Sequence, residues 1–398
     1  MVKVVSGTSG RSLGAVALAL LLLSACGGHS AKPSAPGDGG AGGAGGESGA
    51  SPAGQCSFSQ AAFTVPAARP RFDQPALASV PDGLLAAWRD DRDVDFGLYS
   101  QRLDLQGAAI GSERLLVAGN EPDAKLSLAR SGDAVALAWS DPKSVHVSLL
   151  DLEGTPTNLD LWRSAPADLT SAPRLAAAGK GWGLVWYEGP GQAASISRFA
   201  LIEEDGAAST PLVLAPDSAS AREPRICSTG QRFGVVWTDR RAGRDEVWFR
   251  TLDPSGASLG SERRVGFVDG GQASEASIAC VDDGFAVAWN AAVGGELQVQ
   301  LQQLDAQGSA VGKVWSWAGI FSALGFAGRE LQLLRVETNA GVNELWLERL
   351  AGGATASQSL VEPFGGNALF LPLVAQPGRS YVAWSQDERL QAARVDCP

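Results

Sequence analysis

Short apolar runs that end in a tryptophan recur along most of the chain. Six of them end at Trp88, Trp139, Trp186, Trp237, Trp289 and Trp384. The steps between these tryptophans are 51, 47, 51, 52 and 95 residues, and the last step is close to twice the others. We therefore expect one copy of the unit to lack its Trp. A spacing of about 49 residues indicates a repeat array rather than a series of independent domains.

Each unit predicts four short strands joined by tight turns. The first strand places an apolar residue 11 positions before the Trp in all six clear copies, as Ile226 precedes Trp237. The second strand is the apolar run that ends at the Trp, and its near-continuous character indicates burial on both faces. The third strand alternates and ends in a turn of the Leu-Asp-x-x-Gly type, such as 252–256. There the Asp caps the turn and the Gly adopts a positive φ, before a fourth strand follows.

Four antiparallel strands, repeated radially, form the blade of a β-propeller. Residues 56–398 span 343 positions, or seven units of 49. The stretch 321–360 keeps the strand rhythm with Leu334 in place of a Trp, so we count it as a degenerate copy. The last unit has room for three strands, and the stretch 57–65 is expected to supply the fourth. The sequence therefore predicts an all-β, seven-bladed propeller with four antiparallel strands per blade, closed by its N-terminal strand.

The N-terminus has the pattern of an exported lipoprotein. Lys3 and Arg11 precede an apolar run at 13–23, which is too short to span a membrane and has the proportions of a signal peptide. The following Leu-Ser-Ala-Cys sequence (23–26) resembles the lipobox of bacterial lipoproteins. That resemblance implies cleavage after residue 25, a diacylglyceryl thioether on Cys26 and an acyl chain such as palmitate on its new amine. The alternative is an ordinary cleavage site with an incidental Cys.

The residue after Cys26 is Gly27 rather than Asp, which in the sorting pattern of such lipoproteins implies the outer membrane. The protein body would then lie on the periplasmic or the cell-surface side. Residues 26–55 are mostly Gly, Ala, Ser and Pro, so they cannot bury a core and are expected to form a disordered tether of roughly 30 Å. The predicted organisation is a signal peptide (1–25), a lipidated tether (26–55) and a propeller (56–398).

Four cysteines remain beside the one assigned to the anchor, and an even number in an exported chain suggests two disulfides. Cys56 and Cys397 bracket the folded region and would lie on neighbouring outer strands, where a disulfide would lock the ring. Cys227 and Cys280 fall on the first strands of consecutive units, near the axis. By the 11-residue offset they differ by one register position, and one step along a strand reverses the side. A disulfide and two buried thiols both remain open for this second pair.

Charge and motif content narrow the chemistry. The net charge of −11 repels phosphate backbones, so we expect no nucleic-acid partner. The chain contains only two His, which argues against a His-rich zinc site, and we expect no metal and no cofactor. It has no Gly-x-Ser-x-Gly elbow, phosphate-binding loop or calcium loop. We expect a monomer that contacts the membrane through its lipid.

A candidate ligand face follows from the second position after the Trp, which is acidic in four copies. These residues are Asp90, Asp141, Glu188 and Asp239, and in two copies an Arg follows two residues later, as Arg92 and Arg241. They border the loop between the second and third strands, on the face of a propeller that usually carries ligands. Radial symmetry would gather them into a partial acidic ring for a cation, a sugar or a basic peptide. The alternative is that each carboxylate caps its own turn and forms ion pairs on a solvated rim.

The repeat carries no catalytic signature, and the Ser-x-Asp-x-Gly-x-Thr-Trp box of sialidases is absent. Over most of residues 75–386 it is similar to bacterial extracellular propeller repeats of the form Gly-Phe-x-Val-x-Trp-x-Asp-x-Arg. That resemblance implies a fold and no defined activity. We therefore expect a membrane-anchored extracytoplasmic binding or scaffold propeller, for a protein or a glycan. The alternative is a sialidase- or glycosidase-like enzyme that uses the loop carboxylates.

The tryptophans themselves are expected to be structural. The six periodic ones occupy equivalent positions, which indicates that each fills the space between blades. Trp315 and Trp317 are two residues apart, so both rings would lie on one side of a strand. For this pair, an exposed aromatic patch and packing between blades are both open.

Overall fold

The computed structural model describes residues 56–64, 75–90, 97–119, 125–167, 170–191, 194–268, 271–339, 342–364, 373–386 and 389–397. The chain divides into two units, Met1–Glu47 and Ser48–Pro398, and all of the described residues belong to the second. The predicted signal peptide, Cys26 and the tether lie outside the described residues, and so does Arg92. Within these ranges we find no apolar helix of membrane-spanning length.

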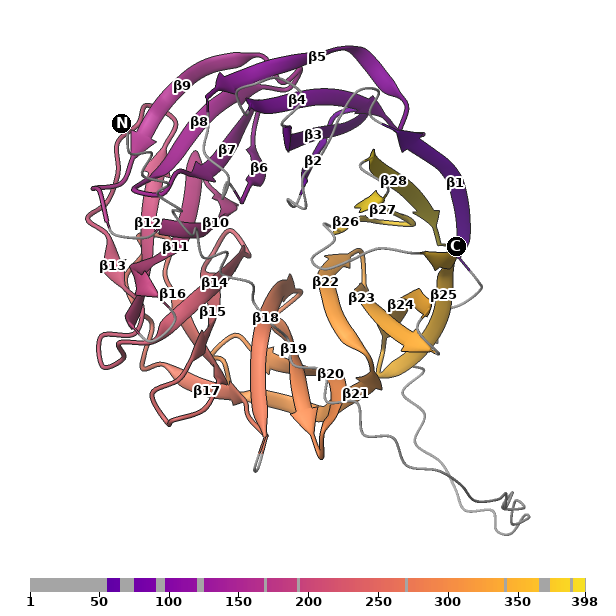
Figure 1. Ribbon diagram of the computed structural model, residues 1–398. Coiled ribbons are helices and arrows are strands. Elements are labelled where there is room, and N and C mark those ends of the chain that lie inside the picture. The colour runs from indigo at the N-terminus through magenta and orange to yellow at the C-terminus, as the bar shows by residue number, and fades with distance from the viewer. Residues whose placement is uncertain are drawn as a thin grey trace, which may run out of the picture. The chain divides into compact units, whose positions relative to one another are not determined.

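The second unit is a seven-bladed β-propeller, as the sequence predicted. Its four-stranded antiparallel sheets form a ring in which the first strand of each blade is innermost (Figure 1). Blade 1 contains β2 (Ala76–Val80), β3 (Gly83–Asp90), β4 (Gly97–Asp104) and β5 (Ala109–Ala118). Blade 2 contains β6 (Ser127–Ser131), β7 (Ala134–Ser140), β8 (Val145–Asp151) and β9 (Pro156–Arg163). Blade 3 contains β10 (Thr170–Ala178), β11 (Gly181–Gly191), β12 (Ala194–Glu203) and β13 (Leu212–Val213).

The remaining blades repeat the same order. Blade 4 contains β14 (Ala221–Ser228), β15 (Phe233–Asp239), β16 (Glu246–Leu252) and β17 (Arg263–Gly266). Blade 5 contains β18 (Gln272–Val281), β19 (Gly284–Val293), β20 (Glu296–Asp305) and β21 (Ala310–Ala318). Blade 6 contains β22 (Ile320–Ala327), β23 (Glu330–Asn339), β24 (Val342–Ala351) and β25 (Ala354–Phe364). Blade 7 contains β26 (Leu373–Gln376), β27 (Arg379–Gln386), β28 (Arg389–Asp396) and the N-terminal β1 (Ser57–Thr64).

The turn between the third and fourth strands follows the predicted chemistry. In blade 4, Oδ1 of Asp253 accepts hydrogen bonds from the backbone amides of Ser255 and Ala257, at 2.8 and 2.9 Å. Gly256 has a φ of 85°, a conformation in which a side chain would be strained. Its hydrogen atom also faces the ring of Phe199 in the preceding blade, which leaves no room for a Cβ. The repeated Asp-x-x-Gly turn therefore shapes the blade and seats it against its neighbour.

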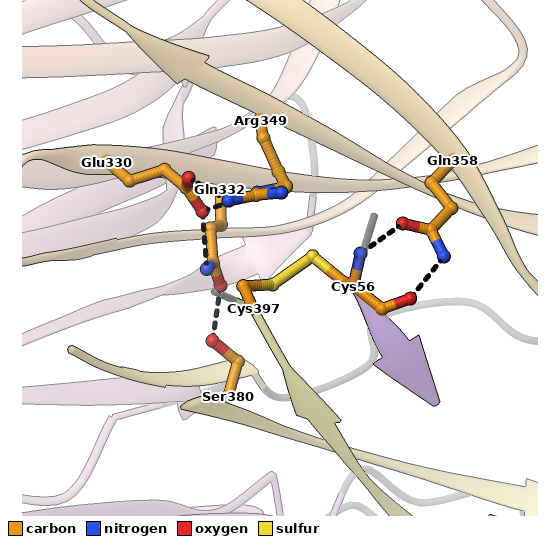
Figure 2. The surroundings of a disulfide bond; sticks show 7 residues. All are labelled: Cys56, Glu330, Gln332, Arg349, Gln358, Ser380 and Cys397. Atoms are coloured by element: carbon orange, nitrogen blue, oxygen red, sulfur yellow. Dashed lines mark hydrogen bonds and ion pairs between the residues drawn. A yellow bond between two sulfur atoms is a disulfide. The ribbon is translucent and has the colours of Figure 1, made fainter. Parts of the chain in front are cut away.

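The N-terminal strand closes the ring. β1 pairs antiparallel with β28, with Ser57 opposite Asp396, and the disulfide between Cys56 and Cys397 fastens their ends. Figure 2 shows that blade 6 holds the same point, because the side-chain amide of Gln358 accepts a bond from the backbone N–H of Cys56 and donates to its carbonyl, at 2.9 and 2.6 Å. The predicted closure and its disulfide are both confirmed.

The five periodic tryptophans whose side chains the structure describes are core residues. The side chains of Trp88, Trp186 and Trp237 are at most 1% exposed. In the degenerate blade the expectation that Leu334 replaces the Trp is wrong by one residue. Leu333 lies opposite Leu324 as Val235 lies opposite Ile226, so Arg335 occupies the Trp position, and Leu334 is buried on the other face of the sheet, against blade 7. Trp315 and Trp317 are half-buried and pack against the apolar cluster between blades 5 and 6. Packing between blades, rather than an exposed patch, accounts for this pair.

The second disulfide joins Cys227 on β14 to Cys280 on β18, with Cα atoms 5.6 Å apart. The register difference that left this pair open in the sequence is the reason the two side chains meet. Neighbouring blades present opposite faces of their sheets to each other, so residues of opposite parity come into contact. Gly234, the register partner of Cys227, faces Phe285, the register partner of Cys280, in the same way.

Candidate functional site

The innermost strands of blades 3, 4 and 5 each begin with a bulge. The pairing of β14 with β15 shifts between Arg222 and Arg225, and β10 and β18 shift at the equivalent places. In two of these bulges a glutamate has left-handed backbone, since Glu223 and Glu275 each have a φ of 54°. Non-glycine residues rarely adopt this conformation, and such strain is concentrated at functional sites. The bulges therefore mark the start of β14 and β18 as a candidate site.

Charged side chains gather at these bulges. We call them the axial cluster, which comprises Lys125, Arg174, Tyr187, Glu223, Arg225, Glu275 and Asn290. All of them are half-buried except Asn290, which is buried. Arg174 and Arg225 occupy equivalent positions on adjacent inner strands, one residue before the apolar residue of the repeat. The cluster therefore places cations and carboxylates side by side at one end of the propeller axis.

The two arginines are in an unfavourable environment for their charge. Burial, together with the positive charge of Arg225, holds the pKa of Arg174 well below its usual range. Burial also lowers the pKa of Arg225, and the negative charges of Glu223 and Glu275 offset this only in part. Within the described residues, Arg225 makes one hydrogen bond, to the carbonyl of Pro224 at 3.4 Å. Most of its N–H donors are thus uncommitted.

The two glutamates differ in their surroundings. Burial and the nearby charge of Glu223 raise the pKa of Glu275, although Asn290 donates a hydrogen bond to its Oε2 at 2.6 Å. The carboxylate of Glu223 makes no hydrogen bond or ion pair with any residue that the structure describes. One carboxylate is therefore anchored and more easily protonated, and its neighbour has acceptor oxygens to offer.

Arg222, next to Glu223 in the sequence, adds to the charge of the axial cluster. Its Nη2 donates to Oδ2 of Asp245 at 2.7 Å, and only 7% of the residue is exposed. Burial lowers the pKa of Arg222, but the hydrogen bond and charge of Asp245 and the charge of Glu223 outweigh it and raise that pKa. Its Nη1 has no hydrogen-bond partner in the described part of the chain. Arg222 thus adds a fixed positive charge beside Glu223.

A pocket with a mixed lining lies on the other side of the axis. An open pocket of about 470 Å³ is lined by the inner strands of blades 7, 1 and 2. Its walls include Leu77, Leu128 and Leu373, which are the repeat's apolar positions on β2, β6 and β26. Arg130 and Ser79 also line this pocket, so it combines apolar and polar groups, whereas the inner strands of blades 3 to 5 carry the axial cluster.

The acidic positions that the sequence singled out have partners within their own blades. In blade 4, Asp239 is fully buried and accepts hydrogen bonds from the indole of Trp237 at 3.2 Å and from Ser218 Oγ at 2.7 Å. Arg241 donates to the same carboxylate through its backbone N–H, Nε and Nη2, and forms a second ion pair with Glu262. The guanidinium also lies 4.1 Å from the ring centre of Trp248. Asp239 and Arg241 together form a closed network around a buried carboxylate.

The other blades repeat part of this network. The indoles of Trp88 and Trp186 donate to Asp90 and Glu188, each at 3.4 Å, and Arg198 forms an ion pair with Glu188. Asp141 instead caps its loop, because its Oδ1 accepts from the amides of Lys143 and Ser144 at 2.7 and 2.6 Å and its Oδ2 lies 2.9 Å from His146 Nε2. A role of these residues as a ligand face stays a prediction.

The sequence prediction did not include the axial cluster, because the acidic residues that recur lie at the second position after the Trp. A signal was present in the sequence, in the Pro-Arg pairs 173–174 and 224–225 and in glutamates three positions before the repeat's apolar residue. Charge is unexpected on a strand that packs near the axis. Among the described residues, no three His, Cys, Asp or Glu side chains are placed so as to hold a metal ion.

No protein-family model and no curated protein matches the chain. Among solved structures, the polysaccharide lyase Uly1 is similar to it, with a TM-score of 0.53 and 12% identity over 82% of this chain and 90% of the lyase. BBS1N, solved in complex with ARL6DN, is also similar, with a TM-score of 0.52 and 10% identity over 86% of this chain and 97% of that one. At these identities the likeness establishes the propeller fold and nothing further.

Proposed function

We propose that this protein is an extracytoplasmic binding propeller that takes its ligand at the axial cluster. The observation that carries the proposal is the left-handed backbone of Glu223 and Glu275 on adjacent inner strands. Strain of this kind costs about 1–3 kcal/mol per residue and persists only where the surrounding structure imposes it. Here it presents partly exposed charges at an end of the axis, where a ligand has access to several blades at once.

The anchor belongs to the same proposal. The Leu-Ser-Ala-Cys sequence at 23–26, followed by Gly27, supports a lipid on Cys26 and a place at the bacterial outer membrane. The tether of 26–55 would let the propeller reach ligands at roughly 30 Å from the membrane surface. Two or more acyl chains make such attachment stable, whereas one chain alone does not.

Binding is tested with the full-length lipidated protein in detergent. Arrays of glycans and of peptides are probed with the native protein and with Glu223→Gln, and Glu296→Gln, an exposed glutamate on β20, serves as the matched control. We expect at least one ligand class whose affinity falls roughly tenfold in Glu223→Gln and is unchanged in Glu296→Gln. Binding that ignores the Glu223 substitution would place the site elsewhere.

The anchor is tested separately. Mass spectrometry of the mature N-terminus is expected to find an acylated Cys26, and Cys26→Ala is expected to release the protein from membranes. An unmodified N-terminus, or a protein recovered wholly in the soluble fraction, contradicts the lipoprotein assignment. Neither result affects the axial site.

A glycan-active enzyme is the second candidate, and the unequal glutamates favour it. Glycosidases use two carboxylates whose environments separate their pKa values, one acting as the acid. Burial and the charge of Glu223 raise the pKa of Glu275, which suits the acid of such a pair. A polysaccharide lyase is among the solved propellers with this fold.

The enzyme candidate predicts turnover of a glycan by the native protein. Release of reducing ends or unsaturated ends from a polysaccharide panel is measured, and Glu275→Gln is expected to lower the rate at least about a hundredfold. Turnover that survives in Glu275→Gln would show that this carboxyl is not the catalytic acid. No turnover of any polysaccharide would leave binding as the only proposed function.

A further inference from the structure

We propose that the axial cluster recognises the carboxylate of an acidic sugar, with Arg225 and Arg174 on the carboxylate and Glu223 and Glu275 on neighbouring hydroxyls. This inference rests on the proposed function and specifies the chemistry of its ligand. Its first element is Arg225, a half-buried guanidinium with a single hydrogen bond among the described residues, at 3.4 Å. A buried cation without a bonded anion is costly, and a bound carboxylate removes that cost.

The two arginines, at equivalent positions on adjacent inner strands, have a chemistry that suits an anion rather than a neutral group. Guanidinium forks bind carboxylates through paired hydrogen bonds, which are shorter and stronger than bonds between neutral groups. The side chain of Arg174 is already held in place, because its Nη1 donates to the carbonyl of Pro173 at 2.9 Å and to that of Leu126 at 3.4 Å. Burial and then the charge of Arg225 lower the pKa of Arg174, so an anion placed beside both arginines would offset their burial and their mutual repulsion.

The glutamates restrict which anion fits. Glu223 and Glu275 lie within electrostatic range of Arg225, and two carboxylates beside the site repel a densely charged group such as a phosphate. A single carboxylate surrounded by hydroxyl donors meets both requirements, because the hydroxyls donate to the glutamates while the carboxylate accepts from the arginines. Uronic acids have this arrangement of groups.

The supporting side chains favour a sugar over a peptide. Asn290 holds Glu275 in place, and burial together with Glu223 raises the pKa of Glu275, which weakens its attraction for an ammonium group. Hydroxyl groups, in contrast, bond to a carboxyl in either protonation state. The disulfide between Cys227 and Cys280 joins β14 to β18 close to these residues and fixes their spacing.

The test uses the full-length lipidated protein and calorimetry with three probes: a galacturonate oligosaccharide, a neutral galactose oligosaccharide of equal length and an acidic peptide. Arg225→Gln is compared with Arg263→Gln, the same substitution at an exposed arginine of blade 4. We expect the galacturonate oligosaccharide to bind most tightly, and its affinity to fall roughly tenfold or more in Arg225→Gln but not in Arg263→Gln. Arg225→Lys, which keeps the charge but loses the fork, is expected to lie between them.

The other outcomes separate the inference from the function on which it rests. Equal binding of the acidic and neutral sugars, lost in Glu223→Gln but kept in Arg225→Gln, overturns the acidic-sugar inference and leaves the binding site standing. Preference for the acidic peptide overturns the sugar class. Failure of all three probes, or binding indifferent to both Glu223 and Arg225, overturns the inference and counts against the site itself. If Arg225→Gln does not fold, binding of the acidic sugar by the native protein must weaken with added salt more than binding of the neutral sugar, and equal salt dependence overturns the inference.

Discussion

Two carboxylates of blade 4 lie on paired strands and have opposite surroundings. Asp239, on β15, is fully buried and accepts hydrogen bonds from Trp237, Ser218 and Arg241. Glu223, on β14, is half-buried, has a φ of 54° and makes no hydrogen bond or ion pair with the residues described. The first is the kind of carboxylate that holds a fold together, and the second is held in a strained position with its acceptors free for a ligand.

The arginines of the same blade show the same contrast. Arg241 forms ion pairs with Asp239 and Glu262, which outweigh its partial burial and raise its pKa above the usual range. Burial lowers the pKa of Arg225, and no ion pair compensates for it among the described residues. A charged residue in a repeat is therefore assigned to structure or to function by its partners, and residue type alone does not distinguish the two.

The largest predicted effect comes from removing the disulfide between Cys227 and Cys280, which joins the strands that carry Glu223 and Glu275. Replacing both Cys227 and Cys280 by Ser releases a loop whose ends are 53 residues apart. In the chain-entropy model this costs about 4 kcal/mol of unfolding free energy, which denaturant titration measures. The double variant is also expected to lose ligand affinity, because β14 and β18 are no longer held at a fixed spacing.

Non-reducing peptide mapping of the native protein is the accompanying control and is expected to yield a Cys227–Cys280 peptide. Loss of stability with unchanged affinity would show that the disulfide serves the fold alone. In that case the disulfide, like Asp239, stabilises the fold and takes no part in binding.

The next effect tests the structural side directly. Asp239→Asn leaves Arg241 with one ion pair in place of two and weakens the bonds from Trp237 and Ser218, at a cost of about 3 kcal/mol. Burial alone would raise the pKa of Asp239, but the hydrogen bonds from Arg241 and Ser218 lower it. Its contribution to stability is therefore complete above the usual pKa of an aspartate and is lost as the pH falls through the lowered value.

The matched control for Asp239→Asn is Asp283→Asn, an exposed aspartate in the turn between β18 and β19. Thermal unfolding from pH 7 down to pH 3 should show the gap between native protein and Asp239→Asn closing toward acid, with no such trend for the control. Preserved stability but lost ligand binding in Asp239→Asn would return this residue to the candidate ligand face.

Much of the fold can be predicted from the sequence because each element of the repeat occurs several times along the chain. The offset of 11 residues between Ile226 and Trp237 fixes the pairing of β14 with β15 and recurs in five other blades. The short last unit predicts the closure by β1. The Cys227–Cys280 bond stayed open because the sequence shows parity within one strand, whereas the contact depends on how two sheets face each other.

The site was harder to predict because its residues do not recur from blade to blade. Positions that recur, such as Asp239 and Glu188, stand out because they repeat, and both accept a hydrogen bond from the indole two residues before them. Glu223, Arg225 and Glu275 occur in only a few blades, so periodicity does not select them. What distinguishes them is a bulge and a left-handed backbone, which the structure shows and the repeat pattern does not.

A smaller effect, of opposite sign, tests the strained backbone at Glu223. Glu223→Gly removes the side chain from a position with a φ of 54°, where glycine has no steric penalty. We expect the unfolding free energy to rise by about 1 kcal/mol while ligand affinity falls. The matched control is Gln298→Gly on β20, at a site of ordinary strand backbone, and this substitution should be destabilising. Destabilisation by Glu223→Gly would mean that its carboxylate supports the fold.

The smallest effect, and the most specific, is the pH dependence of Glu275→Gln. Burial and Glu223 raise the pKa of Glu275, so its charged form opposes folding at neutral pH. The amide removes that penalty and can still accept the bond from Asn290, so the variant should melt at a higher temperature than the native protein at pH 7. As the pH falls below the raised pKa, the native carboxyl takes up its proton in the folded state and the advantage disappears. Glu296→Gln, at an exposed site, should show no such trend between pH 4 and pH 8, since its carboxyl has no buried partner to lose. A variant less stable than the native protein at pH 7 would place Glu275 beside Asp239, among the carboxylates that the fold requires.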